Sequence, residues 1–433
     1  MNNKIFFLFI GLLPIISSNY FVYTNFINSF LIYVLFIFIP LFFIHKHIRE
    51  KSLIDLSFWI YILVFVGFAF FFQSNNNIFP WLDFKIDNAL IVKTIIIYTI
   101  GIISYIIGRY FSQKSSILQS RDLSITRLNY LLYFSLILIL LVIFTVGIKS
   151  FLLPRVVFTG QVQNQSSSFL ILILRFLQIS LPICIILYYQ KYLKKQVSIF
   201  KLIFTISVTL LYFNPIRSSR LDFLLVMSIL FIYIIKFHSK IWAYSLIIGV
   251  CFIFPLADIF RSFQMYVPSI FDLNKLFTTG DYDGPTTIIA SLIYLKSNSF
   301  LYGENFITAI FSYVPRSIWT GKLYGSGFIL TDSLGLNYPN IGVNMWAESN
   351  LSFGIFGVII FFYLIGRFIS ILNSNYRSDY FTFIIYLYTT AGMIFILRGE
   401  LMQVGLKLVP LIIISFLITK KAGQTSMIKT IDI

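Results

Sequence analysis

The chain of 433 residues is 58% hydrophobic and 19% aromatic, and only 11% of its residues are charged. A water-soluble protein of this length needs more charged residues to cover its surface, so the composition excludes an ordinary soluble globular protein. The net charge of +17 does not indicate nucleic-acid binding, because no basic block interleaved with aromatic residues stands in a soluble segment.

Apolar runs long enough to cross the hydrocarbon core of a bilayer recur along the whole chain. About twelve membrane-spanning helices are predicted, near 4–19, 22–44, 54–72, 88–108, 128–147, 169–190, 198–213, 221–237, 241–257, 353–372, 380–397 and 401–419. The first run has no clear small-residue cleavage site and is followed by further spans, so it is interpreted as a retained helix. Cys184 and Cys251 fall inside apolar runs, which leaves neither a disulfide framework nor a metal cluster.

Basic residues gather in alternate loops and thereby predict the orientation of the chain. They lie at 45–53, 109–127, 191–201, 236–240 and 367–377, and in the tail at Lys420, Lys421 and Lys429. The positive-inside rule makes these loops and both termini cytoplasmic. Most acidic residues map to the opposite side, so we expect the polar chemistry of the protein to lie on the outer face.

The expected fold is all-α: a polytopic transmembrane helical protein of the plasma (inner) membrane, with one large extracytoplasmic loop. Three parts are predicted: transmembrane helices 1–9 over 1–257, the large loop over 258–352, and the last three helices with a short cytoplasmic tail over 353–433. The loop has mixed polarity and contains short amphipathic stretches such as Thr286–Leu295.

Cations on the predicted outer side are the first candidates for chemistry, because the positive-inside rule disfavours them in short outer loops. Arg155, Arg217, Arg220, Arg261, Arg316 and Arg398 lie in outer loops or at helix ends, and Lys93, Arg175 and Lys407 lie roughly 9 Å inside the outer ends of spans. Singly, each side chain either reaches for the interface or pairs with an acid such as Asp222 or Glu400. Jointly, they favour an anionic ligand, because the guanidinium fork matches phosphate oxygens two at a time. A lipid-linked pyrophosphate is the natural candidate.

A second group of candidates is the segment VPRSIWTGKLYGSG, residues 314–327. Arg316 is followed after ten residues by Gly327, with Trp319 and Tyr324 between them. Aromatic rings either stack on sugar faces or mark the membrane interface. The glycines allow the loop backbone to approach a bulky ligand.

With this arginine element the chain resembles the O-antigen polymerase (Wzy) family, or the wider family of oligosaccharide repeat-unit polymerases. The resemblance covers essentially the whole chain and implies a GT-C-like architecture. The stretches WAESNLSFGIFGVII (346–360) and LRGE (397–400) are also similar to members of the family. A second arginine element of the same spacing, present in some members, is absent from this chain.

This resemblance implies a glycosyltransferase without a cofactor. A glycan on undecaprenyl pyrophosphate is transferred to the terminal sugar hydroxyl of a new lipid-linked repeat unit, while fixed cations stabilise the departing pyrophosphate and an acid acts as general base. The candidate catalytic residues are Arg217, Arg220, Arg316, Arg398 and Glu348, and the candidate substrate-binding residues are Arg155, Arg175, Arg261, Lys407, Gly327, Trp319 and Tyr324. The partners implied are the undecaprenyl-pyrophosphate-linked oligosaccharide, membrane lipid, a chain-length regulator and a flippase.

Three other functions remain open. One is a transferase that moves a lipid-linked sugar to an acceptor other than its own repeat unit, which uses the same arginine chemistry. A polysaccharide flippase or transporter also has about twelve spans, although no inverted repeat is visible here. O-antigen ligases share the architecture but use a histidine in the large loop, whereas His45, His47 and His238 all map to cytoplasmic loops. The pair Asp281 and Asp283 has the spacing of a divalent-ion site, but the Gly-Pro that follows favours a turn, so no metal is predicted.

Overall fold

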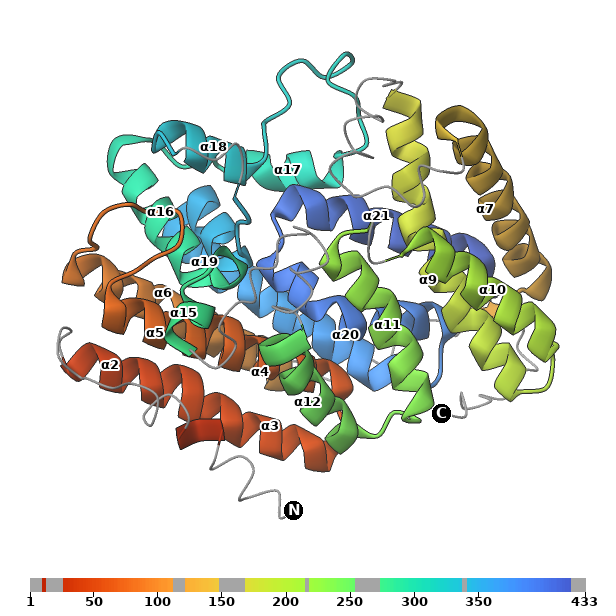
Figure 1. Ribbon diagram of the computed structural model, residues 1–433, viewed down its shortest axis with the longest axis horizontal. Coiled ribbons are helices and arrows are strands. Elements are labelled where there is room, and N and C mark those ends of the chain that lie inside the picture. The colour runs from red at the N-terminus through yellow and green to blue at the C-terminus, as the bar shows by residue number, and fades with distance from the viewer. Residues whose placement is uncertain are drawn as a thin grey trace.

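The computed structural model describes residues 10–12, 26–111, 121–147, 168–214, 218–253, 273–336 and 341–421. The first half contains α2 (Phe26–Tyr33), η1 (Val34–Phe38), α3 (Ile39–Glu50), α4 (Leu53–Tyr61), η2 (Ile62–Phe68), α5 (Ala69–Asn76), α6 (Asn88–Tyr110), β1 (Arg121–Leu123), α7 (Ile125–Val146), α9 (Ser168–Leu193) and α10 (Ile199–Tyr212). The second half contains α11 (Arg220–Ile234), α12 (Ser239–Ile248), η4 (Gly249–Ile253), α15 (Leu273–Phe277), η5 (Gly280–Tyr282), α16 (Gly284–Ser297), α17 (Glu304–Ile310), α18 (Ser326–Ser333), α19 (Met345–Asn375), α20 (Tyr380–Arg398), α21 (Leu401–Ile418) and β2 (Thr419–Lys421). Figure 1 shows these helices packed side by side.

Length and composition of the helices agree with a polytopic all-α membrane protein. Within the described residues, eight helices are long and apolar enough to cross a membrane: Phe26–Glu50, Leu53–Asn76, Asn88–Tyr110, Ile125–Val146, Leu172–Leu193, Met345–Asn375, Tyr380–Arg398 and Leu401–Ile418. Three further predicted spans coincide with shorter apolar helices of 10–17 residues, below the roughly 20 residues that a full crossing needs. The predicted first span, 4–19, lies outside the described residues except for 10–12.

A helix whose long middle stretch, between Asp55 and Gln73, is apolar on nearly every side lies at the centre of the bundle. The rod Leu53–Asn76 runs through α4, the wide turns of η2 and α5, and it is buried along its whole apolar stretch. A helix that is apolar on every side is stable only where other helices surround it. Its aromatic side chains meet those of its neighbours, with the ring of Phe58 stacked 3.7 Å from that of Tyr105 on α6.

Helices α6 and α19 approach each other closely through glycines. A Cβ atom added to Gly108 would lie 2.1 Å from the carbonyl oxygen of Tyr363, and one added to Gly366 would lie 2.2 Å from that of Tyr105. Small residues at such crossings let two backbones come into contact, which is a common way for helices to associate in a membrane.

The end of the bundle that carries most basic loops is held by buried polar contacts, and we call it the basic end. The Asp55 carboxylate accepts hydrogen bonds from Arg109 at 2.8 and 2.9 Å and from the Tyr105 hydroxyl at 2.9 Å. Strands β1 and β2 form a short antiparallel ribbon at the same end, joining Arg121 to Lys421.

Residues 273–336 and 341–344 fold onto the opposite end, which we call the loop end. The Gln73 side chain at the end of α5 donates to the carbonyl oxygens of Phe277 and Tyr282 at 2.9 and 2.8 Å. The predicted amphipathic stretch Thr286–Leu295 lies within α16, and residues 284–291 of this helix are all buried. Helices α16, α17 and α18 therefore form a layer over the ends of the long helices (Figure 1).

Helix α19 is broken near its start. Phe353 and Gly354 have non-helical backbone angles, and the φ of Gly354 is +61°, a conformation that glycine adopts without strain. The predicted span began at 353, at this break, whereas the helix begins at Met345. Residues 345–352 are thus a buried helical piece at the loop end, and the longer piece after the break is the membrane-length helix.

Candidate functional site

Glu348, the predicted general base, lies in the buried piece of α19. Its carboxylate accepts hydrogen bonds from the Ser326 hydroxyl at 2.7 Å, the Asn305 amide at 2.8 Å and the backbone N–H of Leu401 at 2.9 Å. Leu401 is the first residue of α21, so Glu348 satisfies one of the free N–H groups at the start of that helix. Three donors from three elements occupy the carboxylate, which favours a role in holding α17, α18 and α21 together.

Glu400 is a second buried acid at the same place. Its Oε1 atom accepts the backbone N–H of Gly327, the second residue of α18, at 3.2 Å. The carboxylate lies directly on Gly325, where an added Cβ would be 1.8 Å from Oε1. A side chain at 325 would therefore displace the Glu400 carboxylate from this position. The predicted element Arg316–Gly327 thus ends at the carboxylate of Glu400, for which an ion pair was the expected role.

The electrostatics of Glu348 and Glu400, which we call the carboxylate pair, are those of neighbouring acids in a buried place. Burial and the charge of Glu348 raise the pKa of Glu400 to about 7, and the Gly327 N–H opposes this rise. Among the described residues Glu400 has no cationic partner, contrary to the expectation of an ion pair. It accepts one hydrogen bond and keeps capacity for others, unlike Glu348.

Arg398 lies close by in sequence, at the end of α20, but its side chain points to a different group. Its Nε atom is 3.4 Å from Asp283 Oδ1, and its Nη2 atom donates to the carbonyl oxygen of Gly280 at 2.9 Å. The Trp81 indole N–H donates to the other oxygen of Asp283 at 3.3 Å. Burial raises the pKa of Asp283, and the Arg398 guanidinium counteracts this rise. Arg398 thus fastens α20 to the start of α16.

Arg316 is used within its own loop. Its guanidinium donates to the backbone carbonyl oxygens of Lys322 and Leu323 and lies 4.0 Å from the centre of the Tyr324 ring. Trp319, half-buried, lies inside the turn that these bonds close. Among the described residues Arg316 has no carboxylate partner, so its positive charge stays unbalanced next to the start of α18.

Lys407 and Arg175 form a third group with Asp222. The Lys407 ammonium pairs with Asp222, one of the two acids for which the sequence analysis considered an ion pair, and it lies 3.7 Å from the centre of the Phe395 ring. Asp222 also accepts from the Ser219 hydroxyl at 2.7 Å, at the start of α11. Arg175 is near enough to influence the charge of Asp222, and it donates to Gln178 at 3.2 Å.

The structure therefore separates the described candidate cations: Arg398 lies with Asp283, Arg316 in its loop, and Lys407 and Arg175 with Asp222, while Lys93 is exposed on α6 and joins none of these groups. Arg155, Arg217 and Arg261 lie outside the described residues, and Arg220 is described only as the first residue of α11. The candidates that come together are Glu348 and Gly327, and Glu400 joins them. The position of Glu400 directly before an apolar helix predicts a cap for α21, but its side chain gives that helix no cap hydrogen bond and binds the start of α18 instead.

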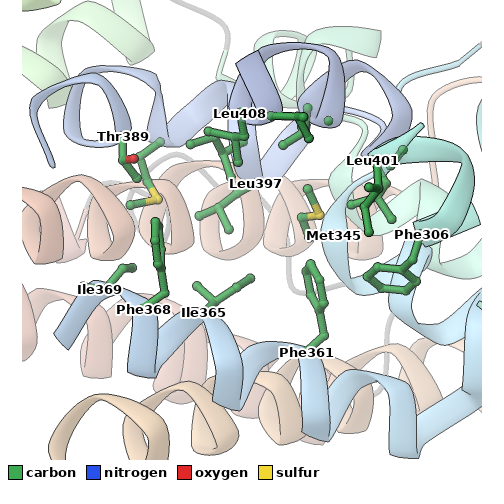
Figure 2. Close-up of a pocket in the computed structure, with 17 residues that line it drawn as sticks. Phe306, Met345, Phe361, Ile365, Phe368, Ile369, Thr389, Leu397, Leu401 and Leu408 are labelled. Atoms are coloured by element: carbon green, nitrogen blue, oxygen red, sulfur yellow. The ribbon is translucent and has the colours of Figure 1, made fainter. Parts of the chain in front are cut away.

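An apolar groove of about 190 Å³ begins beside the carboxylate pair. Figure 2 shows side chains of α19, among them Phe361 and Ile365, pointing across it towards Leu397 and Leu408 on α20 and α21. Leu401, whose backbone N–H is bound by Glu348, lines the groove with its side chain. Three membrane-length helices form its walls, so the groove suits a hydrocarbon chain that ends near a polar headgroup site.

Comparison of the chain with known proteins reveals no relative. No family model matches the sequence. No curated protein and no solved structure resembles the chain significantly.

Proposed function

We propose that the protein polymerises lipid-linked oligosaccharide repeat units into a surface polysaccharide at the loop end of the bundle, on the outer face of the plasma membrane. The observation that carries the proposal is the position of Glu400, a buried acid with a pKa of about 7, directly before a residue that lines an apolar groove. A lipid tail in the groove would bring its headgroup to the carboxylate pair.

The proposed donor is a glycan on undecaprenyl pyrophosphate, and the acceptor is the terminal sugar hydroxyl of a second lipid-linked unit. The hydroxyl oxygen forms a bond to the anomeric carbon while the bond from that carbon to the pyrophosphate oxygen breaks. The electron pair of the broken bond leaves with the pyrophosphate, and the hydroxyl proton passes to the Glu400 carboxylate. A general base works best when its pKa is close to the working pH, and Glu400 meets this condition.

Charge that develops on the leaving pyrophosphate needs a fixed cation. Arg316 is the best placed of the described candidates, because it stands in the loop whose end Glu400 binds and no carboxylate neutralises it. Arg398 and Lys407 are each paired with an acid, which makes them positioning residues in this proposal.

The first experiment is deletion of the gene followed by electrophoresis of the surface glycan. Loss of a polymerase leaves a single repeat unit on the surface carrier in place of a ladder. Loss of a flippase leaves no glycan on the carrier, and loss of a ligase leaves a polymer that stays on its lipid. Either of the last two results would contradict the proposal.

The second experiment complements the deletion with Glu400→Gln. This variant keeps the oxygen that Gly327 binds but cannot take a proton, so we expect the ladder to disappear, with a fall in polymerisation of about 100-fold or more. The matched control is Asp332→Asn, which changes an exposed acid of α18. We expect the control to make a normal ladder at the same protein abundance. A normal ladder from Glu400→Gln would remove Glu400 from the mechanism.

A further inference from the structure

At the basic end, far from the carboxylate pair, three loops enclose a second pocket of about 410 Å³. The loop between α3 and α4, the loop between α11 and α12, and the loop after α19 each contribute to its wall. The basic residues that line it are Lys51, Lys236, His238, Lys240 and Arg377. The size is that of a pocket for a small molecule or a headgroup rather than for a single water.

The charged side chains that line this pocket, which we call the basic pocket, are all positive. Its wall contains no acidic residue, and among the described residues none of its lysines or its arginine forms an ion pair with a carboxylate. Within the described part of the chain, the hydrogen bond that Arg377 donates goes to the neighbouring Tyr376 hydroxyl, at 3.0 Å. Basic loops are general on the cytoplasmic side of membrane proteins, but convergence of three loops on one cavity is not required by that rule. Like charges gathered in a cavity repel each other, and an anion between them removes the repulsion.

Helix α12 begins in the wall of the pocket, at Ser239, and adds to its positive potential. The residue before it, His238, provides no side-chain hydrogen bond to the first N–H groups of the helix. Free N–H groups at a helix start attract anions, so those of α12 supplement the basic side chains. Helix α4 also starts at the wall, at Leu53, but the N–H groups of Leu53 and Ile54 are bound by the Tyr386 hydroxyl.

Two lysines of the pocket have positive φ angles, a backbone conformation that favours glycine. Lys51 and Lys236 have φ values of 56° and 47°, and the next residue, Phe237, has a φ of 57°. These left-handed conformations follow helix ends, where glycine is usual, and they are disfavoured in a residue with a side chain. Strained residues that cluster around a cavity are typical of a binding site.

We propose that this pocket binds a phosphate-bearing anion, carried either by a lipid headgroup or by a soluble phosphate compound. The pocket lies at the ends of the membrane-length helices Phe26–Glu50, Leu53–Asn76 and Met345–Asn375, the level at which headgroups lie. Basic pockets between helices at this level suit anionic lipid headgroups. The site is separate from the carboxylate pair and does not depend on the function proposed there.

The test uses the full chain, purified in a neutral detergent, and a triple variant Lys236→Gln, Lys240→Gln and Arg377→Gln. A matched control, Arg49→Gln with Lys194→Gln and Lys195→Gln, removes the same charge from the same end outside the pocket. Three probes are titrated: phosphatidylglycerol, phosphatidylcholine with the same chains, and inorganic pyrophosphate. The dissociation constant of each is measured by native mass spectrometry.

For the preferred anion, phosphatidylglycerol or pyrophosphate, we expect the unchanged protein and the control to have the same dissociation constant. The pocket variant should bind that anion on the order of 100-fold more weakly. Phosphatidylcholine binding should not differ among the three proteins. Preference for phosphatidylglycerol assigns the phosphate to a lipid, and preference for pyrophosphate assigns it to a soluble compound. Equal binding by the pocket variant and the control, or no binding of either anion, would overturn the proposal.

Discussion

Glu400 shows how a single side chain couples the order of the loop end to protonation. Its pKa of about 7 lies above the ordinary value of 4.5, because burial and the charge of Glu348 disfavour the ionised form in the folded protein. The folded state therefore holds a proton that the unfolded state releases. The resulting stability is fully present below about pH 4.5 and is lost as the pH rises through 7. The neutral acid favours stability, and the ionised acid is the form that acts as a base.

Because ionisation of Glu400 destabilises the folded state, we expect the loop end to open more easily as the pH rises. The charged or polar groups that face Glu400 are the Glu348 carboxylate, which strengthens the effect, and the Gly327 N–H, which weakens it. Between pH 5.5 and 8 we expect hydrogen exchange in 313–336 to become faster, with at most about 3 kcal/mol lost from the local opening free energy. Glu400→Gln should exchange at a rate that, after correction for intrinsic pH dependence, is nearly constant. The same slope in both proteins would show that another group titrates.

At the scale of elements, the contact between α6 and α19 supports both ends of the molecule. Gly366 touches the backbone of α6 beside Tyr105 and Arg109, two of the residues that donate hydrogen bonds to Asp55 at the basic end. The other end of α19 carries Glu348 on its short buried piece. Separation of the two helices would therefore disturb the Asp55 contacts and shift the carboxylate pair.

Gly366→Ala tests this close approach. The new Cβ would lie 2.2 Å from the carbonyl oxygen of Tyr105, so the helices must move apart, at a cost of about 1–3 kcal/mol. We expect a lower unfolding temperature of the purified protein in detergent. Gly249→Ala is the matched control, because its added Cβ would meet nothing within 4 Å. Equal unfolding temperatures for the two variants would show that α6 and α19 accommodate the extra methyl group without cost.

At the scale of the whole molecule, hydropathy was sufficient to predict most helices but not the site. A long run of apolar residues by itself predicts a membrane-spanning helix. The stretch Thr286–Leu295 was likewise predictable as a helix from its own residues. The partners of Asp222 and Asp283 were not predictable in the same way. Lys407 is 185 residues from Asp222, and Arg398 is 115 residues from Asp283. A single sequence carries no record of such pairings. The cations that the sequence analysis expected to form one cluster therefore lie in separate places in the structure, several of them paired with acids.

The orientation of the bundle decides where the carboxylate pair can act. Basic loops at 191–201 and 236–240 predict that the basic end is cytoplasmic, which places the loop end outside. Ser299 is exposed at the loop end and Ser198 is exposed at the basic end, whereas the native Cys184 and Cys251 are buried. Cysteines introduced at these two serines can therefore be labelled against a low background.

We expect a membrane-impermeant maleimide to label Ser299→Cys in spheroplasts and Ser198→Cys only after lysis, with about tenfold less labelling of the second before lysis. Lysed membranes, in which both should react fully, provide the control for access. The reverse pattern would place 273–344 in the cytoplasm. Glu400 would then face a compartment where lipid-linked units are still being assembled, and the polymerase proposal would fail. The basic pocket would still bind phosphate in that case, because its chemistry depends on its charge and not on its compartment.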